Sequence, residues 1–516
     1  MNNLKPAERI VFNTMVLYGR LILVLILGLF TTRIVLDALG ETDYGIYTLV
    51  AGVVGMLAVL QSAMSNTSMR YMSFSLGSGD EKLNSRTFNT TLFLHFIIGF
   101  FVLIFIEVGG FFMFKYLLEI PENKLTDAKV VFHLMALTTF VAIIAVPYDA
   151  VINSHENLFI LSIVDILGAV LKLAVAIYLI YTSANVLILY GLGMFSVQLI
   201  MRMIKQQYSV KHYRECRLNF KKGVDKKLTK EIISFSGWNL LGSVASISVN
   251  QIRSVLLNIF FGVKVNASEG IAKNVRNQVN MVSVSLTRAI NPQLVKSEGK
   301  GDRLRMLWIT DVSTKFSIFL FLIIAIPVII ELPYLLSIWL KDVPEFAVIF
   351  GRLTIIGLLI DKFTFEITSA IRAVGKIRNF QIIETLVIIL NLPVAYFLFK
   401  MSYPPQTIYL TGILFSLITS IYRLYFGKKI TGLNIWLFIK QVIVPSIIPM
   451  MFATFIGILF NLILHQGFIR LLFSTLSMEI SIILCVRYFG ISQKELHIIK
   501  KIINSSKNGF SLWRRR

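Results

Sequence analysis

The sequence is poor in charged residues, and acidic residues are the scarcer kind. Of 516 residues, 15% are charged, with 28 Asp and Glu against 51 Lys and Arg. A soluble globular chain has about 25% charged residues. Hydrophobic residues make up 56% instead, and they fall in separate runs of about 20 residues, each long enough to cross a hydrocarbon layer of about 30 Å. This pattern excludes a soluble globular domain.

Cysteines and nucleotide-binding signatures are scarce or missing as well. Cys216 and Cys485 are the two cysteines, which excludes a disulfide framework and gives no metal-ligand spacing. The sequence has no GxxxxGK[ST] loop, so no ATP site of that kind on this chain drives its activity. No catalytic constellation is visible. We therefore expect neither an enzyme nor a bound cofactor, and we interpret the first apolar run as a retained helix.

The apolar runs predict an all-α integral membrane protein. A membrane β-barrel would show alternating segments of about 10 residues, whereas these runs are continuous and rich in Leu, Ile and Phe. Lipid offers no partners to exposed backbone groups, so such runs must be helical. We expect about 14 transmembrane helices. They are expected at residues 11–36, 45–66, 88–114, 130–149, 158–181, 185–204, 231–261, 269–291, 309–332, 346–369, 379–400, 405–426, 435–463 and 468–489.

The distribution of basic residues predicts the topology. With the N-terminus inside, the inner segments hold 34 Lys and Arg and the outer segments hold 6. Cytoplasmic loops carry such an excess, so both termini should lie in the cytoplasm. Because the net charge of +23 resides in loops between spans, we expect no nucleic-acid partner. Basic loops of this kind can also contact anionic lipid headgroups.

The predicted spans fall into two blocks that resemble each other weakly. Both contain an inner Gly-Asp loop, at Gly79-Asp80 and at Gly301-Asp302. Parallel repeats would place a substrate path between the halves, although apolar helices can also resemble each other by chance. The expected regions are an N-terminal six-helix lobe at 1–204, a basic cytoplasmic linker at 205–230, a C-terminal six-helix lobe at 231–430, two additional helices at 431–490 and a basic cytoplasmic tail at 491–516.

Some basic residues lie within the predicted spans. A charged side chain at mid-membrane costs at least about 2.5 kcal/mol on insertion scales and usually faces a cavity. Arg20 and Arg253 are too deep to reach the interface easily, whereas Arg33 and Arg352 can snorkel. We expect Arg20 and Arg253 to face a water-filled path.

A polar group accompanies Arg253 in the second block. Lys273, Arg276 and Asn277 belong to one polar helix face, and Asn250 precedes Arg253 by three residues. Lys315 interrupts the ninth span. The candidate substrate-binding residues are thus Arg20, Asn250, Arg253, Lys273, Arg276, Asn277 and Lys315.

The excess of deep cations over acids predicts an anionic cargo, because guanidinium groups pair bidentately with phosphate. An exporter of cationic drugs would be expected to place carboxylates in its path instead. Lys172 could alternatively pair with Asp165, seven residues earlier. Acids within the spans could carry a coupling proton or sodium ion, but none has a diagnostic spacing.

Short motifs give a family resemblance over nearly the whole chain. The turn from Leu39-Gly40 to Tyr44-Gly45-Ile46-Tyr47, the Gly-Asp inner loop and the sequence PYDAVINSHENL resemble the polysaccharide transporter family. This family contains the O-antigen and capsule repeat-unit flippases of the multidrug/oligosaccharidyl-lipid/polysaccharide (MOP) export superfamily. The resemblance implies two six-helix lobes around a central cavity plus two C-terminal helices.

The resemblance also implies a substrate and a place of action. The substrate would be an undecaprenyl-pyrophosphate-linked oligosaccharide, moved from the inner to the outer leaflet of the bacterial cytoplasmic membrane. Related flippases line their cavity with arginines from or near the first, second and eighth helices, and Arg20, Arg253 and Arg276 are the positionally similar candidates in this sequence. Membrane lipids and other glycan-assembly proteins would be partners. A multidrug or small-molecule exporter of the same superfamily, and a membrane-embedded glycan polymerase or ligase, are the alternatives.

Overall fold

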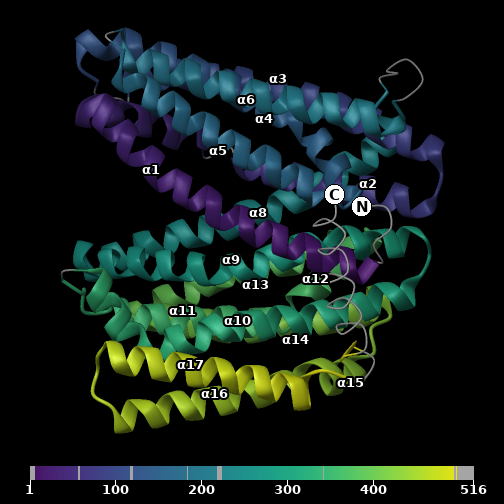
Figure 1. The fold of residues 1–516 in the computed structure, drawn as a ribbon, viewed down its shortest axis with the longest axis vertical. Helices are drawn as coiled ribbons and strands as arrows, with labels where there is room; N and C mark the ends of the chain where they lie inside the picture. Colours follow the sequence, from purple (N-terminus) through teal and green to yellow (C-terminus); the bar gives the residue numbers. More distant parts are fainter. Residues whose placement is uncertain are drawn as a thin grey trace, which may run out of the picture. The chain divides into compact units, whose positions relative to one another are not determined.

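The computed structural model describes residues 6–55, 58–116, 120–182, 184–217, 224–340, 342–492 and 495–496. Every regular element in these ranges is a helix (Figure 1). Within them, 11 helices are long and apolar enough to cross a membrane. The protein is therefore an all-α, multi-pass membrane protein, as the sequence predicts.

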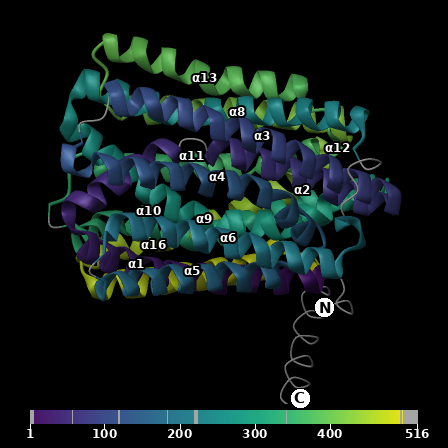
Figure 2. The ribbon, with the colours of Figure 1, turned by 90° about the horizontal axis from the view of Figure 1, so that it is seen from above.

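The chain divides into two compact units, and the boundary falls inside α8. The first unit, Phe12–Leu240, contains six long helices and the start of α8. Within it, α4 packs against α2, α3 and α6, and the long helices run side by side (Figure 2). Its elements are α1 (Pro6–Gly55), α2 (Ala58–Ser78), α3 (Glu81–Tyr116), η1 (Glu122–Lys124), α4 (Leu125–Ser154), α5 (Leu158–Ile180), α6 (Val186–His212) and η2 (Arg214–Cys216), followed by α8 (Lys226–Phe261).

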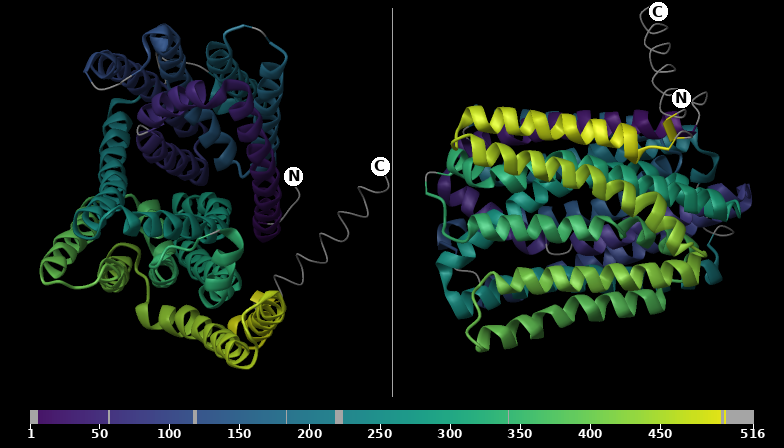
Figure 3. Two further views of the ribbon diagram at one scale, coloured as in Figure 1. Left: turned by 90° about the vertical axis from the view of Figure 1, so that its left-hand side faces the viewer. Right: turned by 90° about the horizontal axis from the view of Figure 1, so that it is seen from below.

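The second unit consists of Leu241–Arg516 together with Met1–Val11. In it α9 packs against α10 and α11, and α14 packs against α11 and α13. The last two long helices, α16 and α17, form a pair (yellow in Figure 3). Beyond α8, its elements are α9 (Val263–Gly299), α10 (Arg303–Trp339), α11 (Ala347–Lys362), α12 (Phe365–Val374), α13 (Arg378–Lys400), α14 (Thr407–Phe426), η3 (Gly427–Thr431), α15 (Ile435–Phe438), η4 (Ile439–Ile443), α16 (Val444–Ile463), α17 (Phe468–Cys485) and η5 (Val486–Gly490).

Three of the 14 predicted spans are helical but are not among the 11 candidate spans. Helices α11 and α12 have only 16 and 10 residues, whereas α9 is long but rich in polar residues. Residues 45–66 fall on the end of α1 and the start of α2, residues 269–291 on α9, and residues 346–369 on α11 and α12. A helix that faces a polar cavity carries polar side chains on that face, which lowers its hydropathy. The count of 14 stays a prediction, and its three weakest members all contribute side chains to cavities described below.

The first two predicted spans are not separated by a loop. Helix α1 continues on both sides of Gly40, where the backbone turns sharply with φ 70° and ψ 173°. A residue with a side chain is strained at such a positive φ, and glycine is not. The predicted turn at this position is therefore a kink inside α1.

The predicted linker at 205–230 is largely built into the fold. Its first residues belong to α6, its last ones to α8, and η2 packs against α3 and α6 between them. His155 and Glu215 anchor η2 through a contact of 2.6 Å between Nε2 and Oε1. Residues 218–223 and most of the predicted tail at 491–516 lie outside the described residues.

Two buried ion pairs attach the C-terminal part of the chain to α10. Arg470 of α17 lies 2.9 Å from Glu331, whose side chain is fully buried. Lys315 lies 2.8 Å from Glu495, and both side chains are less than 10% exposed. Helix α17 is therefore fixed to the C-terminal half of α10 and the segment around Glu495 to its N-terminal half.

Candidate functional site

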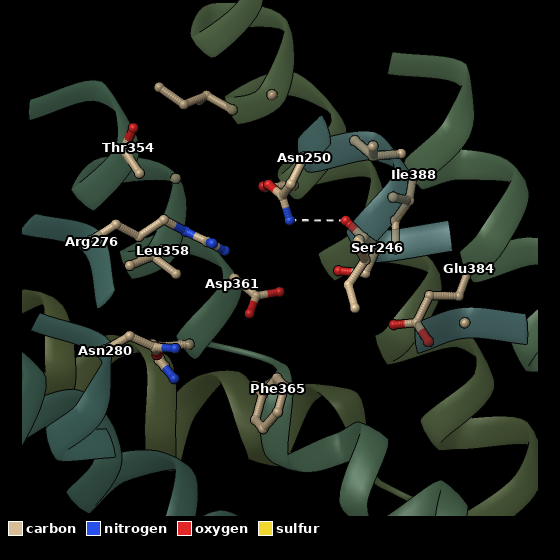
Figure 4. A pocket seen from close by; sticks show the side chains of 18 of the residues that line it. Ser246, Asn250, Arg276, Asn280, Thr354, Leu358, Asp361, Phe365, Glu384 and Ile388 are labelled. Carbon is tan, nitrogen blue, oxygen red and sulfur yellow. Dashed lines mark hydrogen bonds between the residues drawn. The ribbon is translucent and has the colours of Figure 1, made fainter. Parts of the chain in front are cut away.

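A polar cavity of about 550 Å³ lies within the second unit. Its walls come from α8, α9, α11, α12, α13 and α14. Small-molecule sites commonly measure about 300–1,000 Å³. In Figure 4 the side chains of Arg276 and Asp361 extend into this space, with Asn250 and Glu384 on its other side. The cavity is therefore large enough and polar enough to hold a charged group.

Two arginines in this cavity have no carboxylate partner. Arg253 of α8 lies over Tyr409, with its guanidinium carbon 5.5 Å from the ring centre, and its Nε is buried without a hydrogen-bond partner. Within the described part of the chain, neither Arg253 nor Arg276 forms an ion pair. The two guanidinium groups are close enough to repel each other, and Asp361 is close enough to attract Arg276. An anion bound between them would relieve this repulsion.

The two acids of the cavity are both held by a third arginine. Arg423 Nη1 lies 2.5 Å from Asp361 Oδ1, and Nη2 lies 3.0 Å from Glu384 Oε1. The Arg423 side chain is only 7% exposed. Breaking such a buried network by removing one member leaves an uncompensated charge. Arg423 therefore has a structural role. Because both acids pair with it, they neutralise less of the charge on the other basic residues of the cavity.

The cavity therefore has an excess of positive charge. Its described lining residues include two acids, Asp361 and Glu384, and five basic residues. The basic residues are Arg253, Arg276, Lys362, Arg372 and Arg423. Low-dielectric surroundings strengthen the attraction of such a group for an anion, while desolvation opposes it.

The structure brings three of the predicted site residues together in this cavity: Asn250, Arg253 and Arg276. The Asn250 amide donates to the Ser246 carbonyl at 2.9 Å, which fixes its orientation. Lys273 lies outside the lining and contacts Glu269 at 3.2 Å. Asn277 is exposed and also lies outside the lining.

Two further predicted residues lie elsewhere. Lys315 is engaged with Glu495, away from the cavity lining. Arg20 lines a different cavity, of about 470 Å³, within the first unit. There its Nε lies 2.7 Å from Asp165 Oδ2. The alternative pairing of Lys172 with Asp165 is not formed: Lys172 lines this cavity with no ion pair among the described residues.

The first-unit cavity contains a chain of ion pairs. Lys205 lies 2.7 Å from Asp149 and 4.0 Å from Asp165. Together with Arg20, this arrangement uses both acids of the cavity and two of its four basic residues. Lys172 and Arg202 are the other two.

The sequence analysis missed Arg423, Arg372 and Arg202 as cavity residues because it counted them as inner-loop charges. All three lie inside helices. The missing signal is the partner of each residue: one sequence cannot show that Arg423 faces Asp361 and Glu384. Among the described residues, no group of three or more His, Cys, Asp or Glu could hold a metal ion.

Solved transporter structures share this fold. A crystal structure of a MATE point mutant has a TM-score of 0.72 at 11% identity, covering 83% of this chain and 97% of that chain. An outward-facing multidrug resistance MATE family transporter of the MOP superfamily gives 0.71 at 10% identity, covering 83% and 96%. A MOP superfamily transporter from Pyrococcus furiosus gives 0.68 at 11% identity, with the same coverage.

These likenesses show that the chain has the fold of MOP superfamily transporters. At this identity they establish the fold alone. No model of a known protein family and no curated protein matches the sequence. The substrate must therefore be argued from the cavities.

Proposed function

We propose that this protein is a flippase for an undecaprenyl-pyrophosphate-linked oligosaccharide repeat unit. It would move the repeat unit from the inner to the outer leaflet of the cytoplasmic membrane for surface polysaccharide biosynthesis, with both termini in the cytoplasm. The observation that carries the proposal is the cationic cavity of the second unit, where Arg253 and Arg276 form no ion pair among the described residues.

A pyrophosphate complements this cavity chemically. Each guanidinium can donate two parallel hydrogen bonds to phosphate oxygens, and a diphosphate between Arg253 and Arg276 separates two like charges. Ser246, Asn250 and Asn280 line the same space and supply hydroxyl and amide groups suited to sugar hydroxyls. The prenyl chain, which has no polar group, would remain in lipid.

The membrane potential gives the movement a direction. An inside-negative potential favours outward transfer of an anion by about 2.3 kcal/mol per charge per 100 mV. A coupling proton or sodium ion could reset the inward-open state. We propose alternating access between the two units as the route, in keeping with repeat-built transporters.

Cavity polarity is a property that varies on this fold. The Pyrococcus furiosus transporter is described as having a binding pocket of reverse polarity, which suggests a different function for it. A cation-rich cavity on a fold shared with multidrug transporters supports the same distinction here. Anionic cargo is therefore a better match than cationic drugs.

The experiment is complementation of a flippase-deficient bacterial strain. Arg253→Ala and Arg276→Ala, alone and together, should reduce surface polysaccharide at matched membrane levels, with the double variant near background. Arg305→Ala is the matched control, because this exposed arginine of the same unit lies outside the cavity. Normal export by the double variant would refute the cationic site.

The same strain separates the alternatives. A small-molecule exporter of this superfamily would change drug tolerance without restoring surface glycan. A glycan polymerase or ligase would change glycan chain length in vitro, and the transporter fold speaks against it. Restored glycan with unchanged drug tolerance is the result we expect.

A further inference from the structure

A groove runs along one partly exposed face of α6. The groove measures about 550 Å³, and all of its described lining residues belong to α6. They are Leu199, Arg202, Met203, Gln206, Gln207, Val210 and Lys211. Residues three and four positions apart share one face of a helix, so these side chains form a continuous stripe. Met203 and Val210 are 47% and 44% exposed, which leaves the stripe accessible.

One side chain is common to this groove and to the cavity of the first unit. Arg202 lines both of them. Val197, Met201 and Lys205 of the same helix line the cavity only. Arg202 thus lies at the edge between the inner and outer faces of α6. Its Nε is buried without a hydrogen-bond partner, so the guanidinium has a donor left for a ligand.

The groove combines apolar and basic side chains. Leu199, Met203 and Val210 offer hydrocarbon surface, Arg202 and Lys211 supply positive charge, and no acid is among the described lining residues. α6 is itself a candidate membrane span. A lipid with a phosphate headgroup complements such a surface in both polarity and charge.

We propose that this groove docks the phosphate and first isoprene units of the polyprenyl carrier before the carrier reaches the second-unit cavity, with Arg202 binding the phosphate in the groove. The proposal rests on the proposed function, since it takes the carrier lipid from it. It adds a site of first contact on the membrane-facing side of α6. The basic end of α6 would lie at the cytoplasmic leaflet, where the lipid-linked unit is made available.

The test is equilibrium binding of undecaprenyl monophosphate to the purified full-length protein in detergent. Met203→Trp should fill the groove, and Arg202→Ala should remove the shared cation. We expect each to weaken binding at least about tenfold, a change of about 1.4 kcal/mol. Lys211→Ala should weaken it by a smaller factor. Lys227→Ala, which removes an exposed charge on α8, should leave binding within about twofold of the wild type.

Two results would overturn the groove proposal. One is unchanged binding in all three α6 variants, and the other is equal displacement of the carrier by phosphatidylglycerol, which would indicate a general lipid surface. Arg253→Ala/Arg276→Ala separates this proposal from the flippase assignment. That double variant should lose export, and in its background each α6 substitution should still weaken the remaining carrier binding. If the α6 variants show normal export and normal carrier binding, the groove proposal alone is refuted. If carrier binding depends on α6 but the wild type exports no glycan, the flippase assignment alone is refuted.

Discussion

The two units handle their buried charges differently. In the first-unit cavity, two acids are matched by two cations, since Arg20 pairs with Asp165 and Lys205 with Asp149. In the second-unit cavity, Arg423 forms ion pairs with both acids, Asp361 and Glu384. The second arrangement uses fewer cations for the same number of acids.

This difference indicates which of the two cavities should bind an anion more tightly. Among the described residues, five basic side chains line the second cavity and four line the first, and Arg423 forms ion pairs with both acids of the second cavity. Because Asp361 and Glu384 share one partner, Arg423, neither acid is left unpaired, and the cavity keeps a net positive charge. The comparison predicts that structural cations and ligand-binding cations can be separated by substitution.

The largest expected effect is on folding. Arg423→Leu would leave Asp361 and Glu384 buried without a counter-charge, which costs about 3–5 kcal/mol when one partner of a buried pair is removed. Arg20→Leu should cost less, about 1 kcal/mol, because Lys205 remains near Asp165. Thermal unfolding of both detergent-purified variants measures the difference. Equal losses would abolish the distinction between the cavities.

The next effect is on ligand affinity. Asp361→Asn removes the carboxylate that competes for the positive charge of the second cavity, so pyrophosphate should bind about tenfold more tightly. Asp165→Asn, in the first unit, should leave pyrophosphate affinity within about twofold. Calorimetric titration of the purified protein with pyrophosphate checks both values. Weaker binding to Asp361→Asn would show that this acid supports the site instead of opposing it.

A smaller effect concerns pH and the segment after the sixth helix. Burial alone would raise the pKa of Glu215, but its hydrogen bond with His155 and the charge of His155 hold that pKa below its ordinary value. This carboxylate therefore stabilises the fold above its unfolded pKa, and the contribution is lost as the pH falls through its folded pKa. Glu215→Gln should cost about 1 kcal/mol at neutral pH and almost nothing below about pH 4.

The second unit gives the control for that measurement. There η3 is held by Arg303, which donates to the carbonyls of Ile430 and Thr431. Arginine keeps its charge across this pH range, so the part of the Arg303→Gln loss that comes from the two carbonyls should persist at acidic pH. The part that comes from the ion pair of Arg303 with Glu298 should weaken there. Unfolding temperatures between pH 4 and 8 distinguish the two anchors. A pH-independent cost for Glu215→Gln would contradict the assignment.

The smallest effect is expected at Lys172. This residue lines the first cavity without an ion pair in the described ranges, so Lys172→Ala should change the unfolding free energy by less than about 0.5 kcal/mol. The same unfolding assay applies. A loss as large as that of Arg20→Leu would mean that Lys172 belongs to the ion-pair chain.

The strongly apolar spans could be predicted from the sequence because length and continuity of apolar runs are local properties. Helix α9, which is not among the 11 strongly apolar helices, carries polar residues toward a cavity. Composition therefore cannot show that it crosses the membrane. Arg253 could be nominated from its depth, and Arg276 from the polar helix face that it shares with Lys273 and Asn277. The roles of Arg423 and Lys315 could not, because their partners Glu384 and Glu495 are 39 and 180 residues away in the chain.

Helices α10 and α17 form a fixed pair in this protein. Glu331 of α10 is bound to Arg470 of α17, and the two helices pack against each other, while Lys315 of α10 binds Glu495 beyond the end of α17. Spin labels on the exposed positions Ile338 of α10 and Ile469 of α17 would keep one separation during turnover. Any distance that changes from either label to the first unit would then report motion between the units and not distortion within one.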